Sequence, residues 1–237
     1  MLRVLKGNLF NSDRQTLVNT VNCNGVMGAG IALEFRLRHP DMFRQYVDHC
    51  ASGELKVGKL WLYRPTNGKE RRWVLNFPTK KDWKHPSKEE YLHQGLERFV
   101  DTYQRCRIVS IAFPVLGALN GKIPEERAIG IMAQHLYACD DIDIDIYRYD
   151  PAAEDDLYAE CKQRLDTTSD EMISMATGLR LDRVAAIREA MDREEVRSIA
   201  QLGAQKGVGV RTLESVFRYI TADATKDATA VQKKLEF

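Results

Sequence analysis

Short apolar segments alternate with longer amphipathic segments over the first 150 residues of the chain. The short segments are rich in β-branched and aromatic residues and predict strands at residues 2–5, 17–21, 57–63, 71–76, 107–113 and 142–147. Apolar positions at helical spacing predict helices at residues 30–38, 40–52, 87–106 and 124–139. This alternation is typical of an α/β fold with a largely parallel or mixed sheet between helices. Ligands of such sheets bind at the carboxyl ends of the strands.

Three residues mark where predicted helices begin. Pro40 and Pro124 suit the start of a helix, because proline's fixed φ is helical and its missing N–H would be unpaired there. Ser87 and Glu90 have the spacing of a capping box, in which each side chain accepts from the other residue's backbone N–H. We therefore expect Ser87 to open the helix that ends near residue 106.

The pattern changes near residue 150, beyond which no segment alternates convincingly like a strand. Helical spacing predicts five short helices at residues 154–165, 169–177, 182–191, 195–205 and 211–220. Ser169 and Asp182 suit the N-cap position, and Gly178 suits a helix end. We predict an α/β domain at residues 1–152 and a small all-helical domain at residues 153–237, with a polar tail from about residue 222.

The composition is that of an ordinary globular protein. Of 237 residues, 44% are hydrophobic and 29% are charged, and a net charge of +1 gives no field that points to nucleic acid or a membrane. The five cysteines and five histidines show no metal-ligand spacing, and the odd, widely spaced cysteines argue against a disulfide framework. No apolar run of about 18 residues and no signal-peptide pattern occurs. We expect a soluble cytoplasmic protein with no cofactor and no metal ion.

A glycine-rich turn at residues 25–30 joins the strand at 17–21 to the helix that follows. Glycine lets a backbone approach a phosphate closely, and a helix N-terminus favours negative charge. The spacing fits neither a Walker loop nor a dinucleotide fingerprint, so a tight turn without a ligand is the alternative. Asn19, Asn22 and Asn24 lie in or just before this turn and suit ribose hydroxyls, although asparagine also favours such corners for its own turn chemistry.

Two further segments follow predicted strands. Residues 114–121 stand between a buried strand and a helix, which is the context of a second phosphate loop or of a plain connection. Lys80 follows the strand at 71–76. A functional lysine needs burial or a cationic neighbour to lower its pKa. Lys81 would supply the charge and Trp83 some desolvation, whereas an ordinary surface lysine is solvated and inert.

Residues 199–218 read loosely as a helix, a glycine turn and a second helix. Arg211, Thr212, Ser215 and Arg218 would share one face of the second helix, as a DNA-recognition helix requires. Residues 151–237 carry more acidic than basic side chains, which counts against contact with DNA. An ordinary helical bundle is the other interpretation.

Specific strings occur in order along residues 1–150: Lys6-Gly7-Asn8-Leu9-Phe10, Val18-Asn19-Thr20-Val21-Asn22-Cys23, Gly25-Val26-Met27-Gly28-Ala29-Gly30-Ile31-Ala32, Asn76-Phe77-Pro78-Thr79-Lys80 followed by Trp83 and Ser87, and residues 114–121. Together they resemble a macrodomain, the ADP-ribose-binding fold. They look closest to the branch that contains the DNA ADP-ribosyl glycohydrolase antitoxins (the DarG group) and the human-type terminal ADP-ribose glycohydrolase. The resemblance implies a three-layer α/β/α sandwich around a mixed six-stranded sheet, with ADP-ribose at the strand ends.

The resemblance also implies how ADP-ribose would be held. Asn8 sits where the family commonly has an aspartate that reads the adenine amino group, and Asn22 would hold the distal ribose. Residues 28–31 and 117–121 would clamp the diphosphate, and Lys80 matches the lysine on which hydrolysis depends in this branch. The ligand-binding residues expected in this way are Asn8, Leu9, Asn19, Thr20, Asn22, Gly28, Ala29, Gly30, Ile31, Thr79, Pro114, Leu116, Gly117, Ala118, Leu119, Asn120 and Gly121.

The chain departs from the family pattern in two places. Relatives usually have a Gly-Cys-Gly sequence in the second loop, where Ala118 and Leu119 replace the last two residues. Leu119 would crowd the distal ribose or change the φ of the loop. The acidic residue of the human-type enzyme is replaced by Asn120-Gly121, which favours the antitoxin-like interpretation because it needs only the lysine. Residues 154–237 are shorter than the C-terminal half of those antitoxins, which normally contacts the toxin, and are patterned differently.

The resemblance predicts an ADP-ribosyl glycohydrolase of a toxin–antitoxin system, which removes ADP-ribose from a nucleobase, most plausibly thymine in single-stranded DNA. Lys80 would act as a cationic donor or as a nucleophile. The alternatives are a hydrolase of ADP-ribosyl-protein esters, a non-catalytic ADP-ribose reader, and a regulator whose C-terminal helices bind duplex DNA. The expected partners are ADP-ribose, ADP-ribosylated DNA and a cognate ADP-ribosyltransferase toxin, and no membrane.

Overall fold

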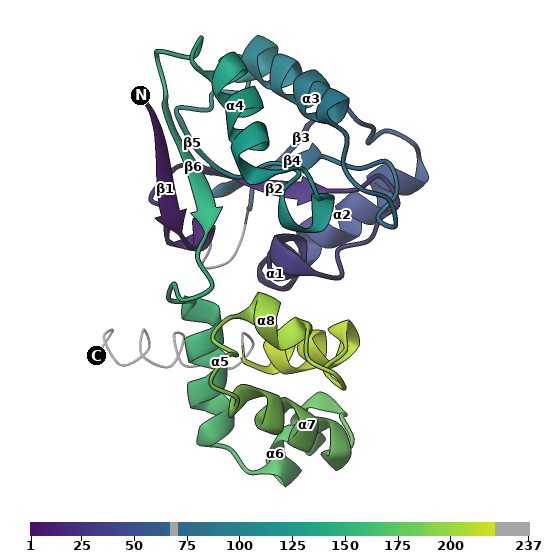
Figure 1. The fold of residues 1–237 in the computed structure, drawn as a ribbon. Helices are drawn as coiled ribbons and strands as arrows, with labels where there is room; N and C mark the ends of the chain where they lie inside the picture. Colours follow the sequence, from purple (N-terminus) through teal and green to yellow (C-terminus); the bar gives the residue numbers. More distant parts are fainter. Residues whose placement is uncertain (67–70, 221–237) are drawn as a thin grey trace, which may run out of the picture. The chain divides into compact units, whose positions relative to one another are not determined.

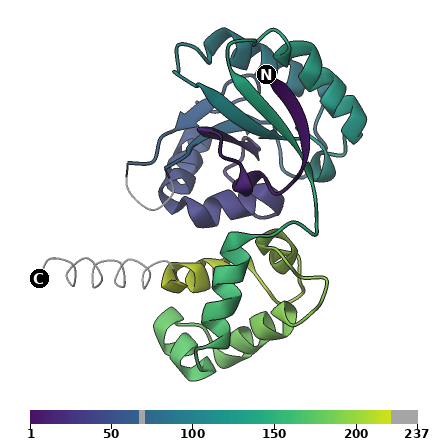
Figure 2. The same cartoon turned by 90° about the vertical axis from the view of Figure 1, so that its left-hand side faces the viewer.

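The computed structural model describes residues 1–66 and 71–220, and the chain divides into two compact units, Met1–Ala153 and the residues from Glu154 onward. Figures 1 and 2 show the two units from perpendicular directions. Sheet and helices make up the first unit, whereas residues 154–220 of the second contain helices and no strand.

The first unit is built on a six-stranded sheet with the strand order β1-β6-β5-β2-β4-β3. The strands are β1 (Leu2–Gly7), β2 (Thr16–Val21), β3 (Trp61–Tyr63), β4 (Trp73–Pro78), β5 (Ser110–Pro114) and β6 (Asp143–Tyr149). All paired strands are parallel except β3, which runs antiparallel to β4. The predicted α/β fold with a mixed sheet is therefore confirmed.

Helices cover both faces of this sheet (Figure 1). They are α1 (Gly30–Arg38), α2 (Pro40–Ala51), α3 (Glu89–Thr102) and α4 (Glu125–Leu136), with short 3-10 turns η1 (Leu9–Asn11) and η2 (Leu119–Gly121). Because strand side chains alternate between faces, Val18 packs in one apolar cluster with Leu96 of α3 and Met132 of α4. Its neighbour Leu17 packs in another with residues of α1 and α2, including Phe35. The two clusters make three layers.

Two predicted elements of this unit were wrong in detail. The strand expected at residues 57–63 is reduced to Trp61–Tyr63, because residues 57 and 58 form a turn in which Gly58 has a φ of +76°. The expected capping box does not form: α3 begins at Glu89 after Lys88, without a side-chain cap. Ser87 instead donates its backbone N–H to Gly121 O at 2.9 Å, so it serves the second loop and not the helix.

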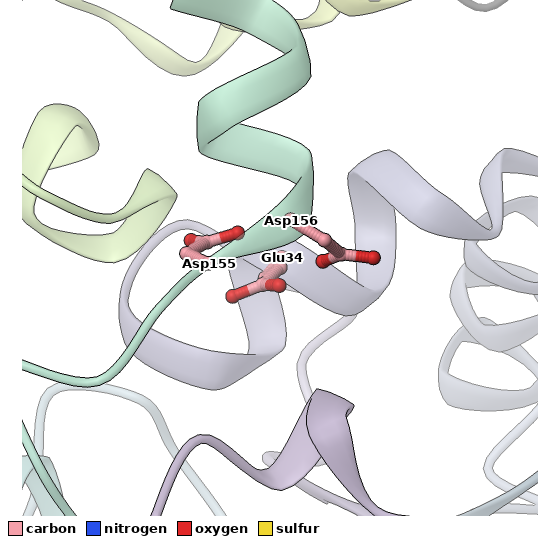
Figure 3. Close-up of side chains that lie close together, drawn as sticks. All are labelled: Glu34, Asp155 and Asp156. Carbon is pink, nitrogen blue, oxygen red and sulfur yellow. The ribbon is translucent and has the colours of Figure 1, made fainter.

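The second unit contains α5 (Asp156–Asp166), α6 (Asp170–Thr177), α7 (Leu181–Met191), α8 (Ile199–Gly203) and a further helix at residues 210–220. Asp155, drawn in Figure 3, joins two of these helices. Its Oδ1 accepts from Tyr158 N at 3.0 Å in the first turn of α5, and its Oδ2 accepts from Ile199 N at 2.8 Å at the start of α8. One buried carboxylate therefore caps one helix and fixes the entry of another.

The predicted ends of these helices were partly correct. Ser169 caps α6 by accepting from Met172 N, and Gly178 ends it in a left-handed conformation, as expected. Asp182 is not a cap, because α7 begins one residue earlier behind Arg180. The helix expected at residues 195–205 shortens to α8. The polar tail expected from about residue 222 lies outside the described residues.

Thr212 corrects the proposed DNA-recognition face. Its side chain is buried within the second unit, whereas Arg211 and Arg218 are exposed and Ser215 is half-buried. The four residues therefore do not present one accessible face. Among the described residues, none of the helices has the length and apolar character needed to cross a membrane.

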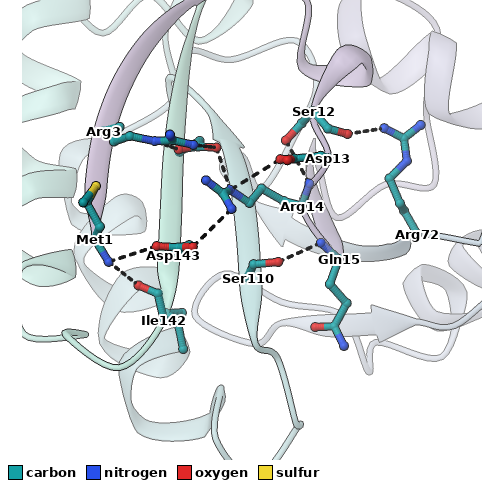
Figure 4. Close-up of polar contacts among 11 residues, drawn as sticks. Met1, Arg3, Ser12, Asp13, Arg14, Gln15, Arg72, Ser110, Ile142 and Asp143 are labelled. Atoms are coloured by element: carbon teal, nitrogen blue, oxygen red, sulfur yellow. Dashed lines mark hydrogen bonds and ion pairs between the residues drawn. The ribbon is translucent and has the colours of Figure 1, made fainter.

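In the first unit, a polar cluster holds the amino edge of the sheet together (Figure 4). Arg3 Nε and Arg14 Nε each lie 2.7 Å from a carboxylate oxygen of the buried Asp145. Burial raises the pKa of this carboxyl, but the hydrogen bonds and charges of the two arginines outweigh burial and hold the pKa below its ordinary value. This cluster joins β1, β6 and the residues just before β2 at the amino edge of the sheet. The segments singled out in the sequence lie at the opposite, carboxyl edge.

Candidate functional site

Three neighbouring parallel strands end together at the carboxyl edge of the sheet. β4, β2 and β5 lie side by side in that order. They lead into three segments that we name the lysine loop (residues 79–88), the first loop (residues 22–30) and the second loop (residues 114–121). The strand order therefore brings together the three segments that the sequence singled out.

The lysine loop is tied to the first loop by its backbone. Cys23 N donates to Lys81 O at 3.3 Å, and Trp83 N donates to Asn24 Oδ1 at 3.2 Å. Thr79 N continues the strand pairing by donating to Val21 O at 2.9 Å. These bonds fix the position of Lys80 relative to the first loop.

The lysine loop also contacts the second loop. Lys80 Nζ donates to the backbone oxygen of Asn120 at 2.6 Å, and the Ser87 N–H holds Gly121 O on the same loop. A charge-assisted hydrogen bond to a carbonyl holds an ammonium group in place. The candidate catalytic amine is therefore fixed against the loop expected to clamp the diphosphate.

The first and second loops meet at Gly30. This residue opens α1 with a φ of +56°, a conformation that favours glycine, and a Cβ added there would lie 2.8 Å from Asn120 Nδ2. Gly117 has a φ of +68°, and its added Cβ would lie 2.9 Å from Ile123 Cδ1. Glycine is thus favoured at both positions, and the three loops form one continuous rim.

The environment of Lys80 lowers its pKa below the ordinary lysine value. Burial of the half-buried side chain is the larger cause, and the positive charge of Lys122 is the second. The cationic neighbour expected from the sequence was Lys81, but Lys122, just after the second loop, fills that role. Desolvation raises the pKa of the nearby Cys23 to about 11, so this thiol stays protonated and is a poor nucleophile.

Asn22 uses its amide to shape the first loop. Its Nδ2 donates to Val26 O at 2.6 Å, and its Oδ1 accepts from Tyr46 Oη at 3.0 Å and from Asn24 N at 2.9 Å. The side chain is buried at the start of the turn. Its expected role at the distal ribose stays a prediction, and its contacts give it a structural role in the same loop.

Asn19 and Asn8 are engaged within the protein. Asn19 is fully buried on β2, where its Nδ2 donates at 2.9 Å to Oδ1 of Asn76, its neighbour on β4. Asn8 follows β1 at the carboxyl edge, and its Oδ1 accepts from Phe10 N at 3.0 Å to cap η1. Asn19 therefore supports the sheet beneath the first loop, while Asn8 keeps the backbone after β1 in place.

The remaining residues expected in the site divide by exposure. Leu9, Thr79, Leu116, Gly117 and Gly121 are buried, so they shape the loops from within. Thr20, Gly28, Gly30, Ile31, Pro114 and Ala118 are half-buried, and Ala29, Leu119 and Asn120 are exposed on the rim.

Three residues organise the site in ways that the sequence did not indicate: Ser87 and Asn24, for which it suggested other roles, and Lys122, which it did not single out. Ser87 packs against the second loop, with its Oγ buried and without a partner among the described residues. Asn24 accepts a hydrogen bond from the backbone N–H of Trp83 through its Oδ1. The positive charge of Lys122 lowers the pKa of Lys80. Ser87 belongs to the strings that carried the resemblance and Asn24 lies between two of them, but their partners lie on other loops and so are not visible in the sequence.

The fold and the three loops define a macrodomain, and the chain belongs to this family. Residues 18–132 match the model of the Macro domain. The solved macrodomain of Mycobacterium tuberculosis DarG is 38% identical, with a TM-score of 0.59 over 62% of this chain and 97% of that one. The macrodomain of Thermus aquaticus DarG is 40% identical, with a TM-score of 0.58 over 64% and 99%. The Thermosipho africanus DarTG structure, in complex with ADP-ribose, is 32% identical, with a TM-score of 0.59 over 62% of this chain and 41% of that one.

Curated relatives of greater length are also similar in sequence. The DNA ADP-ribosyl glycohydrolase of Thermus aquaticus is 34% identical over 89% of this chain and 58% of its own length. That of Mycobacterium tuberculosis is 38% identical over 62% and 42%. The chain therefore spans about half the length of the curated relatives it matches. Similarity to the Thermus protein covers 213 residues, more than the first unit contains, so it extends into the second unit. At least part of residues 154–237 therefore matches this relative, although we expected the region to be patterned differently.

Proposed function

We propose that this protein is an ADP-ribosyl glycohydrolase that removes ADP-ribose from a nucleobase of single-stranded DNA. The observation that carries the proposal is the Lys80 ammonium, held 2.6 Å from Asn120 O where the lysine loop meets the second loop. Relatives named DNA ADP-ribosyl glycohydrolase support the same activity.

The two glycine-containing loops suit the diphosphate of ADP-ribose. Ala29, the N-cap of α1, makes no side-chain capping bond. Uncapped N–H groups and the helix dipole favour a bound phosphate. Gly30 and Asn120 meet above this helix start, which allows the second loop to close on the same diphosphate. Fixing the diphosphate and the riboses orients the bond to be broken.

The reaction breaks the bond between C1″ of the distal ribose and the base. The base leaves with the bonding electron pair, and positive charge develops on the ribose ring. As a cation, Lys80 donates a proton or hydrogen bond to the leaving base while water attacks C1″. As a neutral amine, it attacks C1″ itself, and water then hydrolyses the lysyl adduct. A lowered pKa shifts Lys80 toward the neutral amine that the second route needs, and Cys23, being protonated, does not compete.

The direct test measures free ADP-ribose released from two substrates at equal concentration. One is single-stranded DNA with ADP-ribose on a base, and the other is a protein with ADP-ribose on a carboxylate. Release from the DNA supports the proposal, whereas release from the protein alone assigns the enzyme to ester substrates. Tight binding of ADP-ribose without release from either substrate contradicts a glycohydrolase.

A non-catalytic reader of ADP-ribosylated targets is the second candidate. Leu119 favours it, because this exposed side chain stands in the second loop where relatives are expected to carry glycine, next to Asn120. A bulky side chain there would hinder the movement of substrate that turnover requires. The reader and the hydrolase differ in the two-substrate assay, since only the hydrolase releases ADP-ribose.

We further propose that the protein counteracts an ADP-ribosyltransferase toxin. In Thermosipho africanus a relative is named as a fusion of DNA ADP-ribosyl transferase and DNA ADP-ribosyl glycohydrolase. Joining the two activities in one chain supports a paired role for this protein as well. Co-expression with a DNA ADP-ribosyltransferase is expected to restore growth and to lower the ADP-ribose content of DNA. Growth restored without loss of the DNA modification would instead indicate neutralisation by binding.

A further inference from the structure

Exposed apolar side chains stand on all three loops of the candidate site. Val26 of the first loop is 37% exposed, Trp83 of the lysine loop 51% and Leu119 of the second loop 70%. Met27 and Leu116, on the first and second loops, are fully buried. Exposed apolar groups gathered around one site mark a binding surface. The rim therefore offers apolar contacts to whatever extends beyond the bound ADP-ribose.

The backbone holds Leu119 exposed in an unusual conformation. Its φ is +46°, in the left-handed region that residues with a bulky side chain rarely adopt. Hydrogen bonds from Gly121 N to Ala118 O at 2.8 Å and from Lys122 N to Leu119 O at 3.1 Å fix this turn. Backbone strain of this kind clusters at ligand-binding sites. Leu119 is therefore a candidate contact for the bound substrate.

The lysine loop carries three further lysines, one of them beside Trp83. Lys84 Nζ lies 5.6 Å from the centroid of the Trp83 ring, and Lys81 and Lys88 lie 5.7 and 5.8 Å from the ring of Tyr91. The neighbouring Glu89 is paired with Arg127 of α4 at 2.7 Å and does not neutralise them. None of the three lysines forms an ion pair with a carboxylate in residues 1–66 or 71–220. Their charges remain open to an anionic partner.

We propose that Trp83 stacks on a base of a single-stranded nucleic acid next to the modified nucleotide, while Lys81, Lys84 and Lys88 bind the phosphates of that strand. The proposal rests on the proposed function and deepens it by naming what selects the substrate beyond ADP-ribose. Aromatic faces within a basic surface are the recurring means of binding single strands.

The same geometry disfavours a duplex. The faces of bases in a duplex are stacked on one another, so a tryptophan reaches a base face only in a single strand or after a base leaves the stack. Leu119 neighbours Asn120, the residue that accepts from Lys80, and Trp83 lies three residues after Lys80. The two exposed apolar residues therefore stand on the two loops that the Lys80 amine joins.

The first test uses an unmodified, labelled single-stranded oligonucleotide and fluorescence anisotropy, so it does not depend on hydrolysis. Trp83→Ala is expected to bind about 5- to 150-fold more weakly than the wild type, the range for loss of one base–aromatic stack. Trp83→Phe keeps an aromatic face and is expected to retain most of the affinity. Tyr137→Ala is the matched control, because this aromatic side chain is 73% exposed at the far end of α4, at the opposite edge of the sheet.

The second test compares two substrates for hydrolysis, an ADP-ribosylated oligonucleotide and an ADP-ribosylated mononucleotide. For Trp83→Ala, the ratio of the KM for the oligonucleotide to the KM for the mononucleotide is expected to rise by about 5- to 150-fold, because only the oligonucleotide offers a neighbouring base for stacking. Lys84→Ala is expected to reduce the salt dependence of oligonucleotide binding by about one phosphate contact. Arg105→Ala, which removes an exposed charge after α3, serves as the control.

Equal oligonucleotide affinity for the wild type and Trp83→Ala overturns the inference, as does tighter binding of a duplex or of an ADP-ribosylated peptide. If no substrate is hydrolysed but oligonucleotide binding still depends on Trp83, the proposed function fails and the stacking role stands. If both substrates are hydrolysed and the ratio of their KM values is the same in Trp83→Ala as in the wild type, the proposed function stands and the stacking role fails.

Discussion

Replacing Gly30 by alanine perturbs the point at which the first and second loops meet. Two costs follow from the geometry. Gly30 has a φ of +56°, and in this left-handed region a Cβ destabilises the folded state by about 1–2 kcal/mol. The new methyl group would also lie 2.8 Å from Asn120 Nδ2, but this is the flexible end of a side chain and moves away at small cost.

The expected loss of stability is therefore about 1–2 kcal/mol, carried by the backbone. Urea unfolding followed by tryptophan fluorescence measures it, because Trp61, Trp73 and Trp83 all lie in the first unit. Asn120→Ala in the same chain is expected to leave this loss in place, since it relieves only the contact. Affinity for ADP-ribose in calorimetry is expected to fall, because a shifted backbone at Gly30 moves the N–H groups at the start of α1 that are proposed to bind the diphosphate.

Gly130→Ala is the matched control. Gly130 lies within α4, and an added Cβ there meets nothing within 4 Å. Alanine is preferred to glycine inside a helix by about 0.5–1 kcal/mol, so this variant is expected to be more stable than the wild type. Gly30→Ala with wild-type stability and wild-type affinity for ADP-ribose would refute both the left-handed conformation and the contact between the loops.

Other predictions address the site and the helices behind it. Asn22→Ala is expected to weaken ADP-ribose binding in calorimetry, and unchanged affinity would remove this residue from the site. If Lys80 acts as a cation, activity is expected to fall as pH rises through the lowered pKa of Lys80, and if it acts as a neutral amine, activity is expected to rise. Lys122→Ala removes a neighbouring positive charge, so it is expected to raise the pKa of Lys80 and move either pH profile to higher pH. His135 has a lowered pKa, first because of burial and then because of the charge of His93, whose Nδ1 lies 2.8 Å from its Nε2. The unfolded chain therefore gains the proton first, and stability is expected to decline as pH falls below 6.5. His135→Gln is expected to flatten that decline in urea unfolding, and an unchanged slope would contradict it.

Much of the fold was accessible from the sequence because its signals are local. The glycine turn and the apolar spacing predicted α1 with its observed bounds, Gly30–Arg38. Other helices and strands were displaced by a few residues at their ends. The capping box at Ser87 failed because a tertiary bond to Gly121 O competes for the residue, and no local pattern reports such a bond.

The sequence predicted which segments form the site, but not which atoms of those segments contact one another. The sequence segments that resemble the macrodomain family predicted that Lys80, the first loop and the second loop lie at the carboxyl edge of the sheet. The bond from Lys80 to Asn120 O joins residues 40 positions apart, so spacing alone cannot reveal it. The same holds for Lys122, whose effect on Lys80 depends on the path of the second loop. For Asn22 and Asn19 the sequence suggested a ligand and gave no sign that their amides are also used inside the protein.

The central claim is that the amine of Lys80 acts on the bond between ADP-ribose and a nucleobase. Lys80→Ala measured side by side for ADP-ribose affinity and for release of ADP-ribose from single-stranded DNA tests it most directly. Affinity is expected to be retained while turnover falls by about 100-fold or more, as for a group that acts in the transition state. Turnover close to that of the wild type would contradict the claim.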